Sequence, residues 1–244
     1  MELFIIRHGQ SANNVLEDDS QRTYDPPLTD LGKQQAEKLA QFLADSANRD
    51  PQFNMGSGYA SSDSLPGFGI THLYCSAMHR ALQTAAPIAG ALGLRPEVWL
   101  EVHEQGGMYL DQEGGRVGYP GRTRHEILGE FPDYVLPATV TDAGWYDAAH
   151  GYEEMHQGAG RAIKVVMELR RRAISSEFKD ARIALVTHGT FIDLMLKAFL
   201  GQLPNRQFFF THYNTAITRV DLTADHLLIR YVNRVSHLPH ELIS

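Results

Sequence analysis

The stretch LFIIRHG at residues 3–9 places four consecutive apolar residues directly before an arginine, a histidine and a glycine. Four apolar residues without alternation are typical of a strand that is covered on both faces, as in the middle of a parallel sheet. In open α/β sheets, ligands bind just beyond the carboxyl ends of the central strands. Arg7 and His8 are therefore predicted to lie at a binding cleft.

A second stretch of the same kind lies far along the chain. The segment IALVTHG at residues 183–189 is another apolar run that ends in His188 and Gly189, and an apolar, helix-like segment follows at 190–200. The carboxyl ends of parallel strands meet at one edge of a sheet. The sequence thus predicts that His8 and His188 approach each other there.

The rest of the chain alternates between strand and helix patterns, which predicts an α/β fold. Helices are expected at 31–44, 77–93, 123–131, 161–175 and 190–200, and further strands at 71–76, 96–100, 215–222 and 227–232. The last two strands are predicted to form an antiparallel edge hairpin on a mostly parallel sheet, in a three-layer α/β/α arrangement. We expect one domain over 1–244, with a cap-like insertion at about 105–160 and a surface excursion at 48–69.

Composition limits the kinds of partner. The net charge of −7 and the pI near 5.9 argue against a nucleic acid or an anionic membrane surface. Cys75 is the single cysteine, so no internal disulfide can form and a cytoplasmic protein is expected. The apolar run at 3–6 is too short for a signal peptide or a membrane span. The sequence is compatible with a homodimer.

Arg80 stands in the first turn of the helix predicted after the strand at 71–76. Together with the two histidines it makes the chain resemble the histidine phosphatase superfamily, also called the phosphoglycerate mutase-like family. The resemblance rests on RHGQS at 7–11 with Asn14, LTDLG at 28–32, the Arg80 helix and VTHG at 186–189. It implies an enzyme without metal or cofactor, in which His8 is transiently phosphorylated and water then releases phosphate.

The chemistry of these side chains agrees with that role. Phosphoryl transfer needs a nucleophile in line with the leaving oxygen, and positive charge around the other phosphoryl oxygens. The guanidinium groups of Arg7 and Arg80 should keep His8 neutral and bind phosphate bidentately. His188 could donate a further hydrogen bond to the phosphoryl group.

The leaving group also needs a proton donor, for which a carboxylic acid is suited. The family resemblance implies a glutamate after the strand that follows the Arg80 helix. Glu101 and Glu104 both stand in this region, and we favour Glu104 because VHE at 102–104 is similar to the family's pattern of an apolar residue, any residue and glutamate.

Other residues are candidates for binding the substrate, which is expected to be a small phosphate ester. Ser11 and Asn14 belong to a small, polar loop suited to an anion, and Gly189 follows the second histidine. In the insertion, Arg124 is a candidate among several arginines and aromatic residues. The alternative there is a small satellite core with solvated arginines.

Three other functions remain open from the sequence. A phosphoglycerate mutase would use the same phosphohistidine, although EQGG at 104–107 replaces the glutamate-arginine-tyrosine-glycine stretch of the mutases. A metal hydrolase is suggested by the twelve histidines, but none of them shows the ligand spacing His-x-x-x-His. A noncatalytic module that binds a phosphate ligand is the third possibility.

Overall fold

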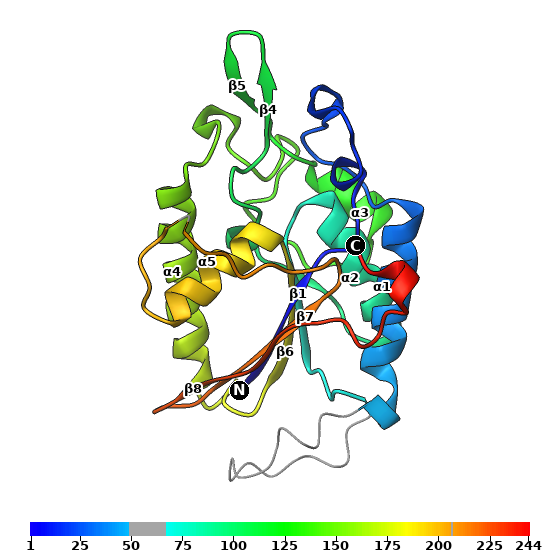
Figure 1. Ribbon diagram of the computed structural model, residues 1–244, viewed down its shortest axis with the longest axis vertical. Coiled ribbons are helices and arrows are strands. Elements are labelled where there is room, and N and C mark those ends of the chain that lie inside the picture. The colour runs from blue at the N-terminus through cyan, green and yellow to red at the C-terminus, as the bar shows by residue number, and fades with distance from the viewer. Residues whose placement is uncertain (49–66, 206) are drawn as a thin grey trace.

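The computed structural model describes residues 1–48, 67–205 and 207–244 (Figure 1). A six-stranded sheet has the strand order β3-β2-β6-β1-β7-β8. Its strands are β1 (Glu2–Arg7), β2 (His72–Cys75), β3 (Glu97–Val98), β6 (Arg182–Thr187), β7 (Ile217–Leu222) and β8 (Leu227–Arg234). The helices are α1 (Asp30–Ala44), α2 (His79–Leu92), α3 (Arg124–Glu130), α4 (Met155–Ala173) and α5 (Gly189–Phe199).

The predicted strand LFIIR is β1, the centre of the sheet. It pairs in parallel with β6 and antiparallel with β7, while β6 pairs in parallel with β2 and β2 with β3. Strands β7 and β8 form the predicted antiparallel edge hairpin. The sheet is therefore mostly parallel, as the uninterrupted apolar runs indicate.

Successive side chains of β1 enter two different cores. Phe4 and Ile6 pack with residues of α1 and α2, whereas Leu3 and Ile5 pack with residues of α4 and α5. Figure 1 shows these helix pairs on opposite faces of the sheet. This confirms the three-layer α/β/α prediction and explains why the strand has no polar alternation.

Helix α1 holds the loop that follows β1. The Thr29 side chain caps the helix by accepting a hydrogen bond from the Gly32 amide. A Cβ atom on Gly32 would lie 2.0 Å from the Gln10 carbonyl oxygen. Only glycine fits this contact between helix and loop, which keeps the residues after His8 in place.

The structure differs from the prediction mainly at boundaries and in the insertion. Helix α4 begins at Met155, six residues before the predicted start at Arg161, because Glu154 and Gln157 form a capping box. The predicted strand 96–100 is reduced to β3, since a 3-10 turn follows at Leu100–Val102. The insertion contains an unpredicted hairpin, β4 (Tyr109–Gln112) and β5 (Gly115–Gly118).

The hairpin β4–β5 projects beyond the carboxyl end of the sheet, opposite the loop that precedes α1 (Figure 1). The surface excursion expected at 48–69 lies mostly outside the described residues. Within its described end, Phe68 is buried against the rings of Phe4 and Phe42. Among the helices that the structure describes, none is both long and apolar enough to cross a membrane.

Candidate active site

The two histidines meet at the carboxyl edge of the sheet. His8 follows β1 and His188 follows β6, and these strands are parallel neighbours that pair Arg7 with Thr187. The centroids of the two imidazole rings lie 5.0 Å apart. The sheet thus brings together side chains that are 180 positions apart, as the two strand patterns predict.

The hydrogen bonds of His8 define the state of its ring. Its Nδ1 lies 2.6 Å from the Gly9 carbonyl oxygen, which can only accept, so Nδ1 carries the proton. Nε2 accepts a hydrogen bond from Nε of Arg80 at 3.1 Å. The side chain of Asn214 donates to the His8 carbonyl oxygen at 2.9 Å. The unprotonated nitrogen of His8 is therefore Nε2.

Burial, and then the positive charges of Arg80 and Arg7, lower the pKa of His8 well below its ordinary value of 6.5. Burial and Arg80 likewise lower the pKa of His188. Within the described part of the chain, neither ring nitrogen of His188 has a hydrogen-bond partner. A neutral His8 retains the lone pair that a nucleophile needs.

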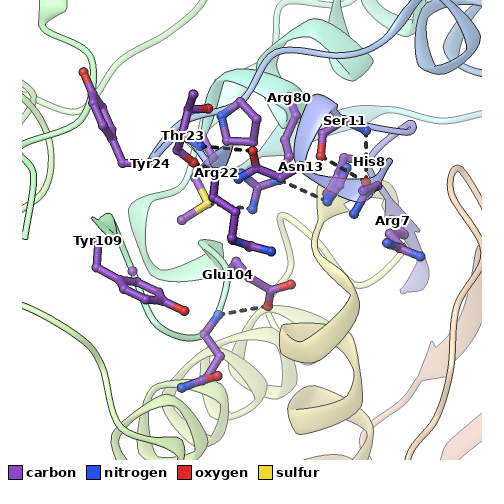
Figure 2. A pocket seen from close by; sticks show the side chains of 15 residues that line it. Arg7, His8, Ser11, Asn13, Arg22, Thr23, Tyr24, Arg80, Glu104 and Tyr109 are labelled. Atoms are coloured by element: carbon purple, nitrogen blue, oxygen red, sulfur yellow. Dashed lines mark hydrogen bonds between the residues drawn. The ribbon is translucent and has the colours of Figure 1, made fainter. Parts of the chain in front are cut away.

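A pocket of about 140 Å³ opens in front of His8 (Figure 2). Its lining is mostly polar and comes from β1 and the loop after it, the start of α2 and the start of the insertion. The lining residues are Arg7, His8, Ser11, Asn13, Asn14, Arg22, Thr23, Tyr24, Pro26, Met78, Arg80, Glu104, Gln105, Gly107 and Tyr109. His188 is fully buried and is not among them.

Two guanidinium groups, that of the half-buried Arg7 and that of the buried Arg80, make the inner end of this pocket positive. Arg7 donates to the His212 carbonyl oxygen at 2.5 Å, and Gly189 leaves space beside its Nε. Arg80 is 8% exposed and contacts the sulfur of Met78 as well as His8. Guanidinium groups of this kind bind phosphate oxygens through two parallel hydrogen bonds. The inner pocket is suited to a phosphoryl group.

The structure separates the two glutamates that the sequence left open. Glu104 lines the pocket, and its carboxylate accepts hydrogen bonds from the amides of Thr190 at 3.3 Å and Phe191 at 3.0 Å, at the start of α5. Glu101 lies exposed in the preceding 3-10 turn. Of the two carboxylates, Glu104 is therefore the one that faces the pocket beside His8.

A buried ion pair supports the segment that carries Glu104. Arg161 binds Glu153 through two hydrogen bonds of 2.6 and 2.8 Å, and also donates to the backbone carbonyls of Glu101 and His103. Both side chains are largely buried, at 11% and 7% exposed. No local sequence pattern indicates this pair, because the contact depends on how the insertion folds against α4.

Changing Glu153 to Gln is expected to lower the free energy of unfolding by about 3 kcal/mol or more, because it leaves the buried Arg161 charge without its partner. Urea denaturation would measure the change. Asp111→Asn is the matched control: Asp111 pairs with Arg116 in the hairpin β4–β5, where the two side chains are 73% and 45% exposed, and its loss should cost less than about 1 kcal/mol. Equal effects of the two substitutions would contradict a supporting role for the buried pair.

The predicted binding residues lie in different places. Ser11 donates from its amide and hydroxyl to the Asn14 side-chain oxygen, at 2.9 and 3.0 Å, and both residues line the pocket. Gly189 lines a neighbouring cavity with Arg7 and Glu104.

The structure does not bring Arg124 to the pocket. Its guanidinium donates to the carbonyls of Pro137 and Val140, because the insertion folds back on itself. Sequence reasoning instead missed Arg22 and Gln105, which do line the pocket. Arg22 lies in a segment of acidic and turn-forming residues, and nothing in that segment indicates that its side chain faces the site.

The residues described by the structure contain no group of three histidine, cysteine, aspartate or glutamate side chains placed to hold a metal ion. The sequence profile of the histidine phosphatase superfamily, branch 1, matches residues 3–53 and 59–235. No curated protein matches the chain.

Solved structures with a similar fold include several phosphatases. A histidine-to-alanine mutant of phosphoserine phosphatase from Entamoeba histolytica, bound to phosphoserine, is 20% identical, with a TM-score of 0.56 over 98% of this chain and 99% of that one. A mycobacterial glucosyl-3-phosphoglycerate phosphatase is 19% identical, with a TM-score of 0.54 over 96% and 99%. A putative alpha-ribazole-5'-P phosphatase from Escherichia coli is 18% identical, with a TM-score of 0.59 over 96% and 97%.

Proposed function

The chain belongs to the histidine phosphatase superfamily, and on that premise we propose that it is a metal-independent phosphatase that hydrolyses a small phosphate monoester through a phosphohistidine on His8. The observation that carries the proposal is the unprotonated Nε2 of His8 at a pocket lined by Arg7 and Arg80. That arrangement supplies a neutral nucleophile and a counter-charge for phosphate in one place.

In the first step, Arg7 and Arg80 hold the phosphoryl oxygens while Nε2 of His8 attacks phosphorus. The bond from phosphorus to the ester oxygen breaks, and that oxygen takes a proton from the acid form of Glu104. Nδ1 of His8 keeps its proton and its hydrogen bond to Gly9, so the ring keeps its orientation. The products of this step are phosphohistidine and an alcohol.

In the second step, water attacks the phosphorus of the phosphohistidine. Glu104, now a carboxylate, takes a proton from the water, and Nε2 leaves as the neutral imidazole of His8. The amides of Thr190 and Phe191 hold the Glu104 carboxylate in position for this role. The cycle ends with inorganic phosphate between the two arginines.

Mixing the enzyme with a phosphate ester and stopping the reaction in alkali tests the proposal. We expect a phosphoryl group on His8 that survives alkali and is lost in acid, together with release of phosphate into solution. Transfer of the group back to a phosphoglycerate, faster than its release, would instead favour a mutase. Binding of phosphate without either reaction would favour a noncatalytic module.

The lowered pKa of His8 predicts a specific pH dependence. As the pH falls through about 6.5, unfolded chains bind a proton at this histidine but the folded protein does not. The His8 ring should therefore stay neutral and reactive, while the free energy of unfolding decreases because protonation favours the unfolded state. The ring ¹⁵N resonances of His8 should show the neutral, Nδ1-protonated form between about pH 5 and pH 8. A His8 ring that titrates near 6.5 would contradict this prediction.

A further inference from the structure

The mouth of the pocket is built from two arms of the chain. Arg22, Thr23 and Tyr24 come from the loop before α1, while Gln105 and Tyr109 come from the insertion. Arg22 and Tyr109 also line a second cavity of about 670 Å³, between the turn at residues 19–22 and β4. The phosphoryl pocket therefore continues outward past these two side chains, and the second cavity offers space for the rest of a substrate.

Arg22 brings a third guanidinium group to the site. Figure 2 shows its side chain pointing into the pocket, near Arg80 and Glu104. Burial lowers the pKa of Arg80, the nearby carboxylates raise it, and the positive charges of Arg7 and Arg22 lower it further, which places Arg22 within electrostatic reach of Arg80. Arg22 thus faces the ligand space from the side opposite the sheet.

The acidic side chains near Arg22 do not neutralise its positive charge. Its contact with Asp19 is 3.4 Å long, and the two side chains are 48% and 87% exposed. A pair of this kind contributes little, because water competes for both partners. Glu104, the carboxylate in the pocket lining, is engaged by the amides that start α5.

The number of cations exceeds what a phosphoryl group needs. Arg7 and Arg80 lie at the inner end with His8 and can bind the phosphoryl oxygens, whereas Arg22 lies at the mouth. A guanidinium at that point would attract a second negative group on the substrate, and a neutral leaving group would leave it unused.

We propose that the substrate is a phosphate ester whose leaving group carries a second anion, a carboxylate or another phosphate, and that Arg22 binds this anion. The proposal rests on the phosphatase function proposed above and adds a substrate class to it. Arg22 acts here as a specificity residue, since it makes no contact with His8 in the proposed reaction.

Pairs of esters that differ only in the second anion test this assignment. Phosphoserine is compared with phosphoethanolamine, phosphoglycerate with glycerol phosphate, and a sugar bisphosphate with its monophosphate. The first two pairs test a carboxylate and the third tests a phosphate. Each pair is assayed with the parent enzyme, Arg22→Gln and Arg22→Lys.

In at least one pair, we expect the parent enzyme to show a kcat/KM about tenfold or more higher for the ester that carries the second anion. A factor of this size corresponds to the free energy of one hydrogen bond to a charged group. Arg22→Gln should remove that preference by raising KM for the ester with the second anion. The kcat/KM for the ester without it should change less than about twofold. Arg22→Lys should restore part of the preference. Arg116→Gln is the control, because Arg116 lies on β5 over the Tyr152 ring, outside the pocket lining.

Equal losses for both members of a pair would show that Arg22 binds the phosphoryl group itself and would overturn the proposal. An absence of preference in the parent would overturn it as well. Binding of the same pairs to His8→Ala, with and without Arg22→Gln, is measured by calorimetry. This arm tests the second anion without turnover, so a failure of the phosphatase function is distinguished from a failure of the Arg22 assignment.

Discussion

Replacing His8 with alanine is expected to reduce phosphate release by about 10³-fold or more, because the side chain forms the covalent bond to phosphorus. The alkali-stable phosphoryl group should be absent as well. Arg7 and Arg80 remain in place in this variant, so it should still bind inorganic phosphate. Initial rates with a phosphate ester, and calorimetry with phosphate, measure the two properties separately.

His226→Ala is the matched control for that experiment. His226 is exposed at the turn between β7 and β8, which lies at the end of the sheet opposite the pocket because β7 runs antiparallel to β1, and its removal should leave the rate unchanged. A His8→Ala variant as active as the parent would refute the proposed nucleophile. So would a phosphoryl group that still forms on another residue at the parent rate.

Changing Glu104 to Gln is expected to slow hydrolysis of an alkyl phosphate by about 10²- to 10⁴-fold, because an alkoxide leaves poorly without a proton. Glutamine keeps an acceptor oxygen for the Phe191 amide, so the fold of this segment should persist. With an aryl phosphate the first step should be much less affected, since a phenolate leaves without help. The second step still lacks its base.

The two effects together predict a diagnostic result. With the aryl ester, Glu104→Gln should release one equivalent of phenolate rapidly and then accumulate phosphohistidine, which rapid-quench kinetics would detect. Glu101→Gln is the matched control, since this exposed residue differs from Glu104 by three positions and should keep the parent rates. Equal defects in both variants, or no defect in Glu104→Gln, would remove Glu104 from the mechanism.

Much of the fold could be predicted because it depends on local apolar runs. The strand at residues 3–7 has no polar alternation, and the structure shows why: Phe4 and Leu3 enter cores on opposite faces of one sheet. A run of that kind fixes both the strand and the layer order. The hairpin β4–β5 could not be predicted in this way, because neither strand has a buried residue and β5 begins and ends with glycine.

The site was predictable where it lies at the ends of those strands. His8 and His188 follow buried runs, and the parallel pairing of β1 with β6 brings them together. The insertion gave no such constraint. Arg124, a predicted binding residue, lies outside the pocket lining, because its guanidinium donates hydrogen bonds to nearby backbone carbonyls of the insertion.

The local sequence does not specify the hydrogen bonds that distant parts of the chain make to the site. Asn214 binds the His8 backbone and the carbonyl of His212 binds Arg7, although both residues follow more than 200 positions later. Each is an ordinary polar residue before a strand. The antiparallel pairing of β7 with β1 brings the residues before β7 to the end of β1, where they contact Arg7 and His8.

The division between β1 and the mouth of the pocket has a consequence for how this protein can diverge. His8, the residue proposed to react, follows β1, whose four central residues are buried, so few replacements are tolerated there. Arg22 and Tyr109 stand on two surface arms that can vary without disturbing either core. Related proteins could therefore change their substrate through substitutions in these two surface segments while they keep the same reaction.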